Sequence, residues 1–324
     1  MRESLEDRLD NILQDEKAEN TTAAYEKGIK YFWVWADFAK GLEASYPISE
    51  ELLMEYVLDH IEGLPDDIDR KLIECGAKRT EGKHKVTTVR SKLRALAYIH
   101  NKLKYDNPCD SKKIRTILSV AQKKEAKAGI TRNQKRAIIK PMLEQMIKNI
   151  NTRTVVGLRN RALLEFMFYS GGRRRSEGAA ALFKYLTQVK GGYEYVLHHS
   201  KTDQFGKGEV KLIRNTAAKS MKSYLDATKI TDGYLFRKIK KNLVTNKPMT
   251  GHEINLIVKD CVEAIGENPK HYGAHSLRRG FITECGRKKI PIQKAMECSG
   301  HKKIETALIY HEQGDIYSNA ATKL

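Results

Sequence analysis

The stretch YLTQVKGGYEYVLHHSKTDQFGKGEVKLI, residues 185–213, sets the fold class, because its periodicity differs from that of the chain on either side. Apolar and polar residues alternate here. Two glycine-containing breaks, Gly191-Gly192 and DQFGKG, divide the alternation into three runs. Alternation with period two is typical of half-buried strands, and such breaks are typical of hairpin turns. The stretch therefore predicts a three-stranded antiparallel meander inside a chain that otherwise has helical periodicity.

The chain before residue 130 predicts a first domain of four helices. Ser49 is a suitable N-cap for the second helix, and Gly129 follows the fourth, where glycine commonly ends a helix. The spacing of apolar residues predicts which positions face the core of this domain. These are Tyr25, Ile29, Phe32, Trp33, Ala36, Leu53, Tyr56, Val57, His60, Val86, Val89, Leu93 and Leu96.

The third of these helices, at residues 85–103, carries a polar face opposite its apolar one. Thr87, Arg90, Ser91 and Arg94 share that face. Such side chains contact phosphates and base edges along a DNA groove. A solvated helix face has the same pattern, so both interpretations stay open.

A short polar and basic segment, residues 131–137, predicts a linker. Pro141 suits the first turn of a new helix, so we expect the second domain to span residues 138–324. Apart from the meander, this domain is predicted to be helical, with a capping box from Thr250 to Glu253. The expected fold class is mainly α with a small antiparallel β-sheet (α+β), in two domains.

The 324 residues carry a formal net charge of +19, concentrated in the middle of the chain. Residues 101–250 hold 33 Lys and Arg against 11 Asp and Glu. This surplus indicates a surface for a polyanion, most simply nucleic acid, although a merely soluble basic protein has a similar composition. Five scattered cysteines predict reduced thiols and no zinc site. The chain lacks the pattern of a signal peptide or a membrane span, so we expect a cytoplasmic protein without membrane contact.

A helix over residues 274–281 would bring His275, Arg278 and Arg279 onto one face, because positions i, i+3 and i+4 are neighbours. Convergent positive charge of this kind requires an anion. Three other short motifs are similarly dense in basic, histidine or tyrosine residues. The four motifs are SGGRRRSEG (170–178), HHSKTDQFGKG (198–208), AHSLRRGF (274–281) and SGHKKIETALIYH (299–311).

In this order and at these spacings, the motifs resemble the signature of the tyrosine recombinase (phage integrase) family. That signature is an Arg in a Gly-x-Arg-x-Ser-Glu box, a Lys on a β-hairpin, a His-x-x-Arg, a Gly-His, and a Tyr nine residues after that His. Each motif is weak alone, and the conjunction carries the interpretation. The residues implied as catalytic are Arg174, Lys201, His275, Arg278, His301 and Tyr310.

The roles that the resemblance implies agree with the chemistry of a phosphodiester. Two guanidinium groups, Arg174 and Arg278, would bind the non-bridging oxygens as negative charge develops on them. Tyr310 would attack the phosphorus after losing its proton to His275, giving a 3′-phosphotyrosine. Tyr317, the nearby competitor, has the wrong spacing from the preceding Gly-His motif.

Three further residues complete the implied site. Lys201 would protonate the departing 5′ oxygen, with Lys207 as the alternative across the turn. His301 would hydrogen-bond the phosphate, and Glu177 would orient an active-site arginine or histidine. No metal and no cofactor is expected, since the sequence has neither a two-metal acidic cluster nor a P-loop.

The resemblance also implies an architecture and partners. A helical, SAM-like core-binding domain at residues 1–130 and the catalytic domain would form a C-shaped clamp around a double-stranded DNA recombination site. We expect a homotetramer on two sites, strand exchange through a Holliday junction, and accessory DNA-bending proteins. Residues 1–20 are too few for an arm-binding domain, so a simple recombinase is expected, on the nucleoid or, in a eukaryotic host, in the nucleus. Gly280, where the family often has a larger residue, is expected to be without consequence. The expected DNA contacts are Thr87, Arg90, Arg94, Arg132, Lys135, Arg136, Arg173, Arg175 and Arg279.

Two alternatives remain open at this point. A type IB topoisomerase would relax DNA as a monomer by similar chemistry. A non-catalytic DNA-binding protein could keep the scaffold, although it would have no reason to keep Tyr310 and both arginines at these spacings.

Overall fold

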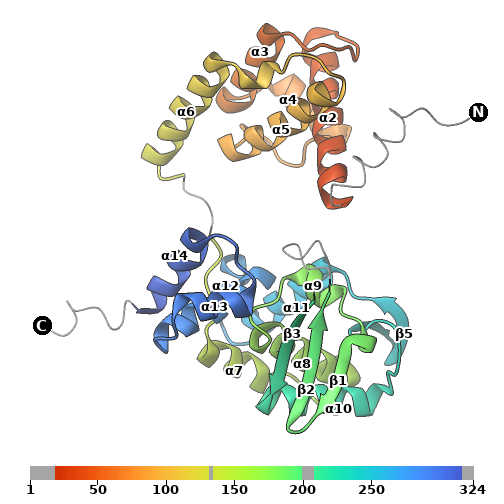
Figure 1. The fold of residues 1–324 in the computed structure, drawn as a ribbon. Helices are drawn as coiled ribbons and strands as arrows, with labels where there is room; N and C mark the ends of the chain where they lie inside the picture. The colour runs from red at the N-terminus through yellow and green to blue at the C-terminus, as the bar shows by residue number, and fades with distance from the viewer. Residues whose placement is uncertain (1–18, 131–133, 199–207, 316–324) are drawn as a thin grey trace, which may run out of the picture. The chain divides into compact units, whose positions relative to one another are not determined.

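The structure, a computed structural model, describes residues 19–130, 134–198 and 208–315. The chain divides into two compact units, Met1–Arg132 and Asn133–Leu324. Within the described ranges the fold is mainly α-helical with two small antiparallel sheets, as Figure 1 shows. The predicted fold class, mainly α with a small antiparallel sheet, is confirmed.

The first unit is helical throughout the part that the structure describes, but it has one helix more than the sequence predicts. The additional helix, α4, is nine residues long, and its buried apolar residues are Ile68 and Leu72 alone. Two apolar positions are too few to reveal helical periodicity. The helices are α2 (Glu19–Lys40), α3 (Glu50–Glu62), α4 (Asp66–Glu74), α5 (Val86–Lys102) and α6 (Lys112–Lys127), with a 3₁₀ turn, η1 (Pro108–Asp110).

The core of the first unit includes buried faces of α2, α3 and α5. Ser49 caps α3 as predicted, and the predicted inward positions of α3 and α5 are buried. On α2 the buried face is rotated from the predicted one. Trp35 is fully buried there, and its indole N–H donates to the Asp59 carboxylate of α3 at 3.2 Å. The predicted inward residues of α2 that are only half-buried are Tyr25, Ile29 and Trp33.

The second unit contains both sheets and the remaining helices. The helices are α7 (Lys140–Lys148), α8 (Val155–Tyr169), α9 (Arg175–Ala179), α10 (Asn215–Thr228), α11 (Gly251–Glu263), α12 (Ala274–Arg287), α13 (Ile292–Ser299) and α14 (Ile304–Asp315), with 3₁₀ turns η2 (Phe183–Tyr185) and η3 (Pro269–His271).

The predicted meander is present. Strands β1 (Leu186–Val189), β2 (Gly192–Leu197) and β3 (Glu209–Arg214) pair antiparallel in that order. Along β2, buried residues alternate with half-buried ones. Tyr195 of β2 packs against Phe166 of α8, with ring centroids 5.2 Å apart. The sheet is thereby anchored on α8, the helix that leads into the SGGRRRSEG motif.

A second hairpin lies where the sequence predicts helices, so that expectation is wrong for this segment. Strands β4 (Arg237–Lys240) and β5 (Leu243–Pro248) pair antiparallel. Lys241 and Asn242 between them have φ of 48° and 62°, as two-residue hairpin turns favour. Arg237 occupies a buried position and pairs with Asp232 at 2.7 Å. Charged residues occur at both buried and exposed positions of this hairpin. The sequence therefore does not show the alternation of apolar and polar residues that predicts a strand.

Residues 134–139, which include most of the predicted linker, belong to the second unit and pack against the rest of it. The Arg136 N–H donates to the His271 carbonyl at 2.8 Å, and the Ile138 N–H donates to the Ser276 carbonyl at 3.0 Å. A Cβ atom added at Gly280 of α12 would lie 1.7 Å from the Ile138 carbonyl oxygen. This approach requires glycine, which gives a physical reason why a larger residue does not stand at this position in this chain.

None of the helices in the described ranges combines the length and the apolar character that crossing a membrane requires.

Candidate active site

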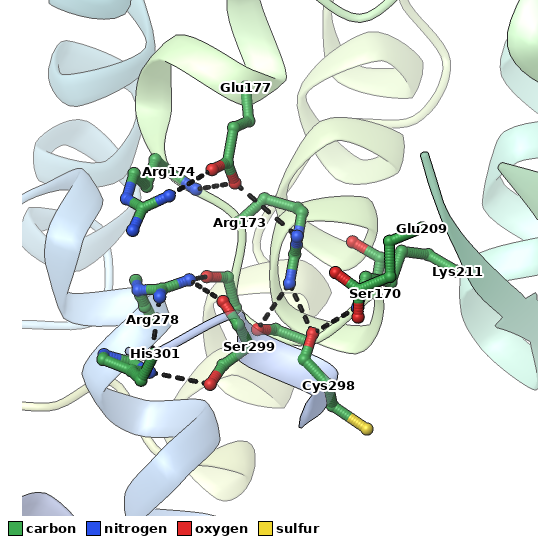
Figure 2. A network of polar contacts seen from close by, with 12 residues as sticks. Ser170, Arg173, Arg174, Glu177, Glu209, Lys211, Arg278, Cys298, Ser299 and His301 are labelled. Carbon is green, nitrogen blue, oxygen red and sulfur yellow. Dashed lines mark hydrogen bonds and ion pairs between the residues drawn. The ribbon is translucent and has the colours of Figure 1, made fainter. Parts of the chain in front are cut away.

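Three segments of the second unit meet at Arg278, which lies in the first half of α12 and is 2% exposed. Its Nη1 donates to the carbonyls of Gly172, at 2.9 Å, and Ser299, at 2.5 Å. Its Nη2 donates to Nδ1 of His301 at 3.3 Å (Figure 2). These contacts occupy three of the five N–H donors of an arginine. Further donors remain with which the guanidinium can bind an anion.

Arg174 stands at the N-cap position of α9 and is held by Glu177. The Arg174 N–H donates to Oε2 of Glu177 at 2.9 Å, and Nη1 donates to Oε1 at 2.7 Å. The Arg174 side chain is 25% exposed, so part of it is accessible to a ligand. Burial lowers the pKa of Arg278 to about 9, and the positive charge of Arg174 lowers it further. The Arg278 guanidinium is still charged at neutral pH.

Glu177 is the anion that fixes this arrangement. Burial alone would raise its pKa, but Arg173 and the backbone and guanidinium of Arg174 outweigh burial and hold the pKa below its usual range. Glu177 is therefore ionised at neutral pH and accepts hydrogen bonds from the backbone and guanidinium of Arg174.

His301 follows α13 and is an uncharged ring. Its Nδ1 lies 2.7 Å from the hydroxyl of Ser299 in addition to the Arg278 contact. A guanidinium can only donate, so Nδ1 must accept and the ring proton must be on Nε2. Burial, and then Arg278 and Arg174, lower the pKa of His301 to about 4. The neutral ring can therefore donate one hydrogen bond, through Nε2, to an anion.

His275 lies one turn before Arg278 on α12 and has an exposed side chain. Its pKa is nevertheless lowered to about 4, because the neighbouring structure partly shields it from water and because Arg279, Arg278 and Arg174 are close. A neutral imidazole at pH 7 can accept a proton, which suits a general base.

Tyr310 lies on α14 and is 8% exposed, inside a small apolar cluster that includes residues of α12 and α13. The Arg279 guanidinium lies over its ring, with Cζ 4.6 Å from the ring centroid. Within the described part of the chain, no hydrogen bond joins its hydroxyl to the arginines and histidines above. The structure thus brings four of the implied catalytic residues together and holds Tyr310 beside them through Arg279. The four are Arg174, His275, Arg278 and His301.

Several predicted residues lie outside the described ranges. Lys201 and its alternative Lys207 belong to residues 199–207, Arg132 to residues 131–133, and Tyr317 to residues 316–324.

The other expected DNA contacts differ in accessibility. Thr87, Arg94, Arg136 and Arg175 are exposed, and three residues are half-buried and already engaged. Arg90 donates to Gln122 at 3.2 Å, Lys135 to the Lys270 carbonyl at 2.5 Å, and Arg279 to the Lys135 carbonyl.

Arg173 does not fit the expectation that it contacts DNA. Its side chain is 1% exposed and turns into the protein, where Nη2 donates to the carbonyls of Gly171, at 3.1 Å, and Cys298, at 2.6 Å. An ion pair with Glu177 at 3.7 Å holds it there. Of the three consecutive arginines, the middle one faces the site, the first is internal and the third is exposed.

Sequence reasoning missed Lys211, a buried lysine on β3. Its Nζ pairs with Glu209 and donates to the Cys298 carbonyl at 2.7 Å. The available signal was the register of the meander, in which Lys211 stands opposite Tyr195 on the inward face.

The part of the chain that the structure describes has no group of three or more His, Cys, Asp or Glu side chains that could hold a metal ion.

Comparison with known proteins gives a concordant result. The sequence profile of the phage integrase family matches residues 137–315. An integrase/recombinase xerD homolog of Selenomonas ruminantium is 27% identical over 323 residues, covering 95% of this chain and 86% of that protein.

Two solved structures share the fold. The XerH site-specific recombinase bound to difH substrate, in a pre-cleavage complex, is 18% identical with a TM-score of 0.52, covering 88% of this chain and 76% of that one. A lambda integrase (75–356) dimer bound to a COC′ core site is 13% identical with a TM-score of 0.58, covering 95% and 94%.

Proposed function

Because this chain belongs to the phage integrase family, we propose that it is a site-specific recombinase that cuts and rejoins DNA through a covalent bond to Tyr310. The observation that carries this proposal is the convergence of two charged arginines and two neutral histidines, with Tyr310 on an adjoining helix. Like charges packed this closely repel one another, and a phosphate placed between them relieves the repulsion.

The two arginines bind the scissile phosphate. Arg278 is immobilised by two backbone carbonyls, and Arg174 by Glu177. Donors fixed before the reaction do not need to reorganise as charge develops on the non-bridging oxygens. His301 adds a neutral donor through Nε2, which stabilises that charge without adding another positive charge to the site.

The chemical step is an in-line displacement at phosphorus. The Tyr310 oxygen forms a bond to the phosphorus as its proton passes to neutral His275, and the bond to the 5′ oxygen breaks. The 5′ oxygen takes a proton, for which Lys201 is the proposed donor. The product is a 3′-phosphotyrosine and a free 5′-hydroxyl, and reversal with a different 5′-hydroxyl rejoins the strand without a cofactor.

The first unit is proposed as the core-binding domain. Its α5 helix presents Thr87 and Arg94 on an exposed face, whereas the excess of basic residues at 101–250 lies mostly in the second unit. By likeness to the DNA-bound XerH and lambda integrase structures, we propose that both units bind one recombination half-site and that four copies exchange strands between two sites.

A denaturing gel tests the chemistry. Duplexes bound by the protein would first be selected from a random library. A nick beside the cleavage point would then let the short product strand dissociate, so that a covalent adduct accumulates. We expect an adduct with wild type and with the control Tyr317→Phe, and none with Tyr310→Phe. Tight binding without any adduct from wild type would overturn the proposal and favour a DNA-binding role alone.

A further inference from the structure

The C-terminal end of α13 is surrounded by three cationic side chains from three other segments. A helix ends with carbonyl groups that lack partners within the helix and that carry the negative end of its dipole. Here Arg173 comes from the turn after α8, Lys211 from β3 and Arg278 from α12, and all three donate to these carbonyls (Figure 2).

The Cys298 carbonyl oxygen is the centre of this arrangement. It accepts from Nη2 of Arg173 at 2.6 Å and from Nζ of Lys211 at 2.7 Å. The next carbonyl, of Ser299, accepts from Arg278 at 2.5 Å. Two residues further on stands His301.

Arg173 and Lys211 are held at this position although both are nearly removed from water. They are 1% and 6% exposed. Burial lowers the pKa of each, and Glu177 and Glu209 are the carboxylates that compensate them. Burying a cation is unfavourable unless it is paired and hydrogen-bonded, so a purely structural contact here would be served more simply by apolar residues.

Gly171 allows this contact to form. Its φ is +99°, and an added Cβ atom would lie 2.2 Å from the Cys298 carbonyl oxygen. The turn after α8 therefore approaches the end of α13 as closely as backbone allows. The same turn carries the Gly172 carbonyl that holds Arg278.

We propose that Arg173 and Lys211 are positioning residues that fix the Cys298 carbonyl and thereby set the orientation of His301 and Arg278 toward the scissile phosphate. The geometric part of this inference stands on the contacts above, and its catalytic part rests on the proposed recombinase function. Neither residue needs to touch DNA, because each acts through the backbone of residues 298–301.

Lys211→Met and Arg173→Met test the proposal, with Lys190→Met as a control on an exposed lysine at the end of the same sheet. The first measurement is ¹⁵N NMR of the imidazole nitrogens in the protein without DNA, with His301→Gln to assign the signal. Wild type and Lys190→Met should have the Nε2–H form of His301 with Nδ1 accepting. Lys211→Met should give a mixture of tautomers, since the ring loses its fixed contact with Arg278.

The second measurement is the rate of covalent adduct formation at saturating DNA. We expect both methionine variants to be slower by roughly 10- to 100-fold, as for small displacements of catalytic groups. Their DNA affinity should stay within about twofold of wild type. Arg173→Lys, which keeps a cation and one donor, should recover part of the rate, and it also serves if Arg173→Met does not fold.

The outcomes separate this inference from the proposed function. An unchanged His301 tautomer in folded Lys211→Met and in the Arg173 variants would overturn the positioning role. A loss of DNA affinity with an unchanged tautomer would instead return Arg173 to direct DNA contact. If wild type forms no adduct, the proposed function fails, while the tautomer measurement still decides whether the two cations position His301.

Discussion

Two neutral histidines stand among the arginines of the candidate active site, and their neutrality has a specific cause. His275 and His301 each have a pKa lowered to about 4, by partial burial first and by the neighbouring guanidinium groups second. A charged ring at either position would add to the repulsion around Arg278. Burial and the arginines therefore keep both rings neutral, as the proposed roles of His275 as proton acceptor and His301 as neutral donor require.

These shifts predict how stability depends on pH. Histidine in the unfolded chain titrates near pH 6.5, so between about pH 6.5 and 4 the unfolded chain binds more protons than the folded one. The free energy of unfolding should then fall as the pH is lowered through this range. The depressed pKa of Glu177 adds a further loss at lower pH still, as that carboxylate becomes protonated.

Urea unfolding at pH 7, 6 and 5 measures this dependence. The double variant His275→Gln/His301→Gln should have a shallower decrease than wild type. Equal slopes in the two proteins would mean that neither ring is held neutral by its surroundings.

At the scale of elements, α12 organises the second unit because its neighbours approach it backbone to backbone. Gly280 touches the segment before α7. Gly286 does the same with α14, since an added Cβ atom would lie 2.0 Å from the His311 carbonyl oxygen. Through these contacts, the segment before α7 and the helix α14, which carries Tyr310, both pack against α12, which carries Arg278.

Gly280→Ala should therefore destabilise the protein although alanine is the better helix former. The gain in helix propensity is about 1 kcal/mol, whereas overpacking against a fixed backbone costs about 1–3 kcal/mol. A lower urea midpoint is expected. Gly178→Ala in α9 is the matched control, because its nearest neighbour is the flexible side chain of Met167 at 3.3 Å. If the two variants are equally stable, the contact with Ile138 is not tight.

The elements that the sequence predicted correctly are those with a clear local pattern. The meander was predictable from alternation and glycine turns, and α3 from its cap and apolar face. The β4–β5 hairpin was not, because buried Arg237 breaks the alternation, and α4 was not, because it has only two buried apolar positions.

The candidate site was predictable only as a set of residues. Motif spacing selected Arg174, Arg278 and His301, which the fold brings together. The spacing of residues in a motif does not reveal in which direction the side chains of neighbouring arginines point. The burial of Arg173 was therefore missed. Lys211 was missed because its proposed role depends on a hydrogen bond to the carbonyl of Cys298, 87 residues away in the sequence.

For the whole molecule, the net charge of +19 predicts strong dependence of DNA binding on salt. A protein that neutralises 6–10 phosphates loses roughly 10³–10⁵ in affinity between 50 and 200 mM salt. We expect a loss of that order for this chain, measured by fluorescence anisotropy with a labelled duplex. An affinity that hardly changes over this range would mean that the basic residues do not contact the phosphate backbone.

The close contact of α12 with α14 also determines whether one copy of the chain can supply Tyr310 to the site of another copy. Tyr310, the proposed nucleophile, lies on α14, which packs against α12, the helix that carries Arg278, so each copy of the chain holds both residues in its own site. Two inactive variants, Tyr310→Phe and Arg278→Lys, should not restore covalent adduct formation when they are mixed on one DNA. A covalent adduct in that mixture would mean that α14 of one copy had moved away from its own α12 and had placed Tyr310 in the site of another copy. If no adduct forms in the mixture, each copy cleaves DNA only with its own Tyr310. The amount of cleaved DNA then falls in proportion to the fraction of inactive copies.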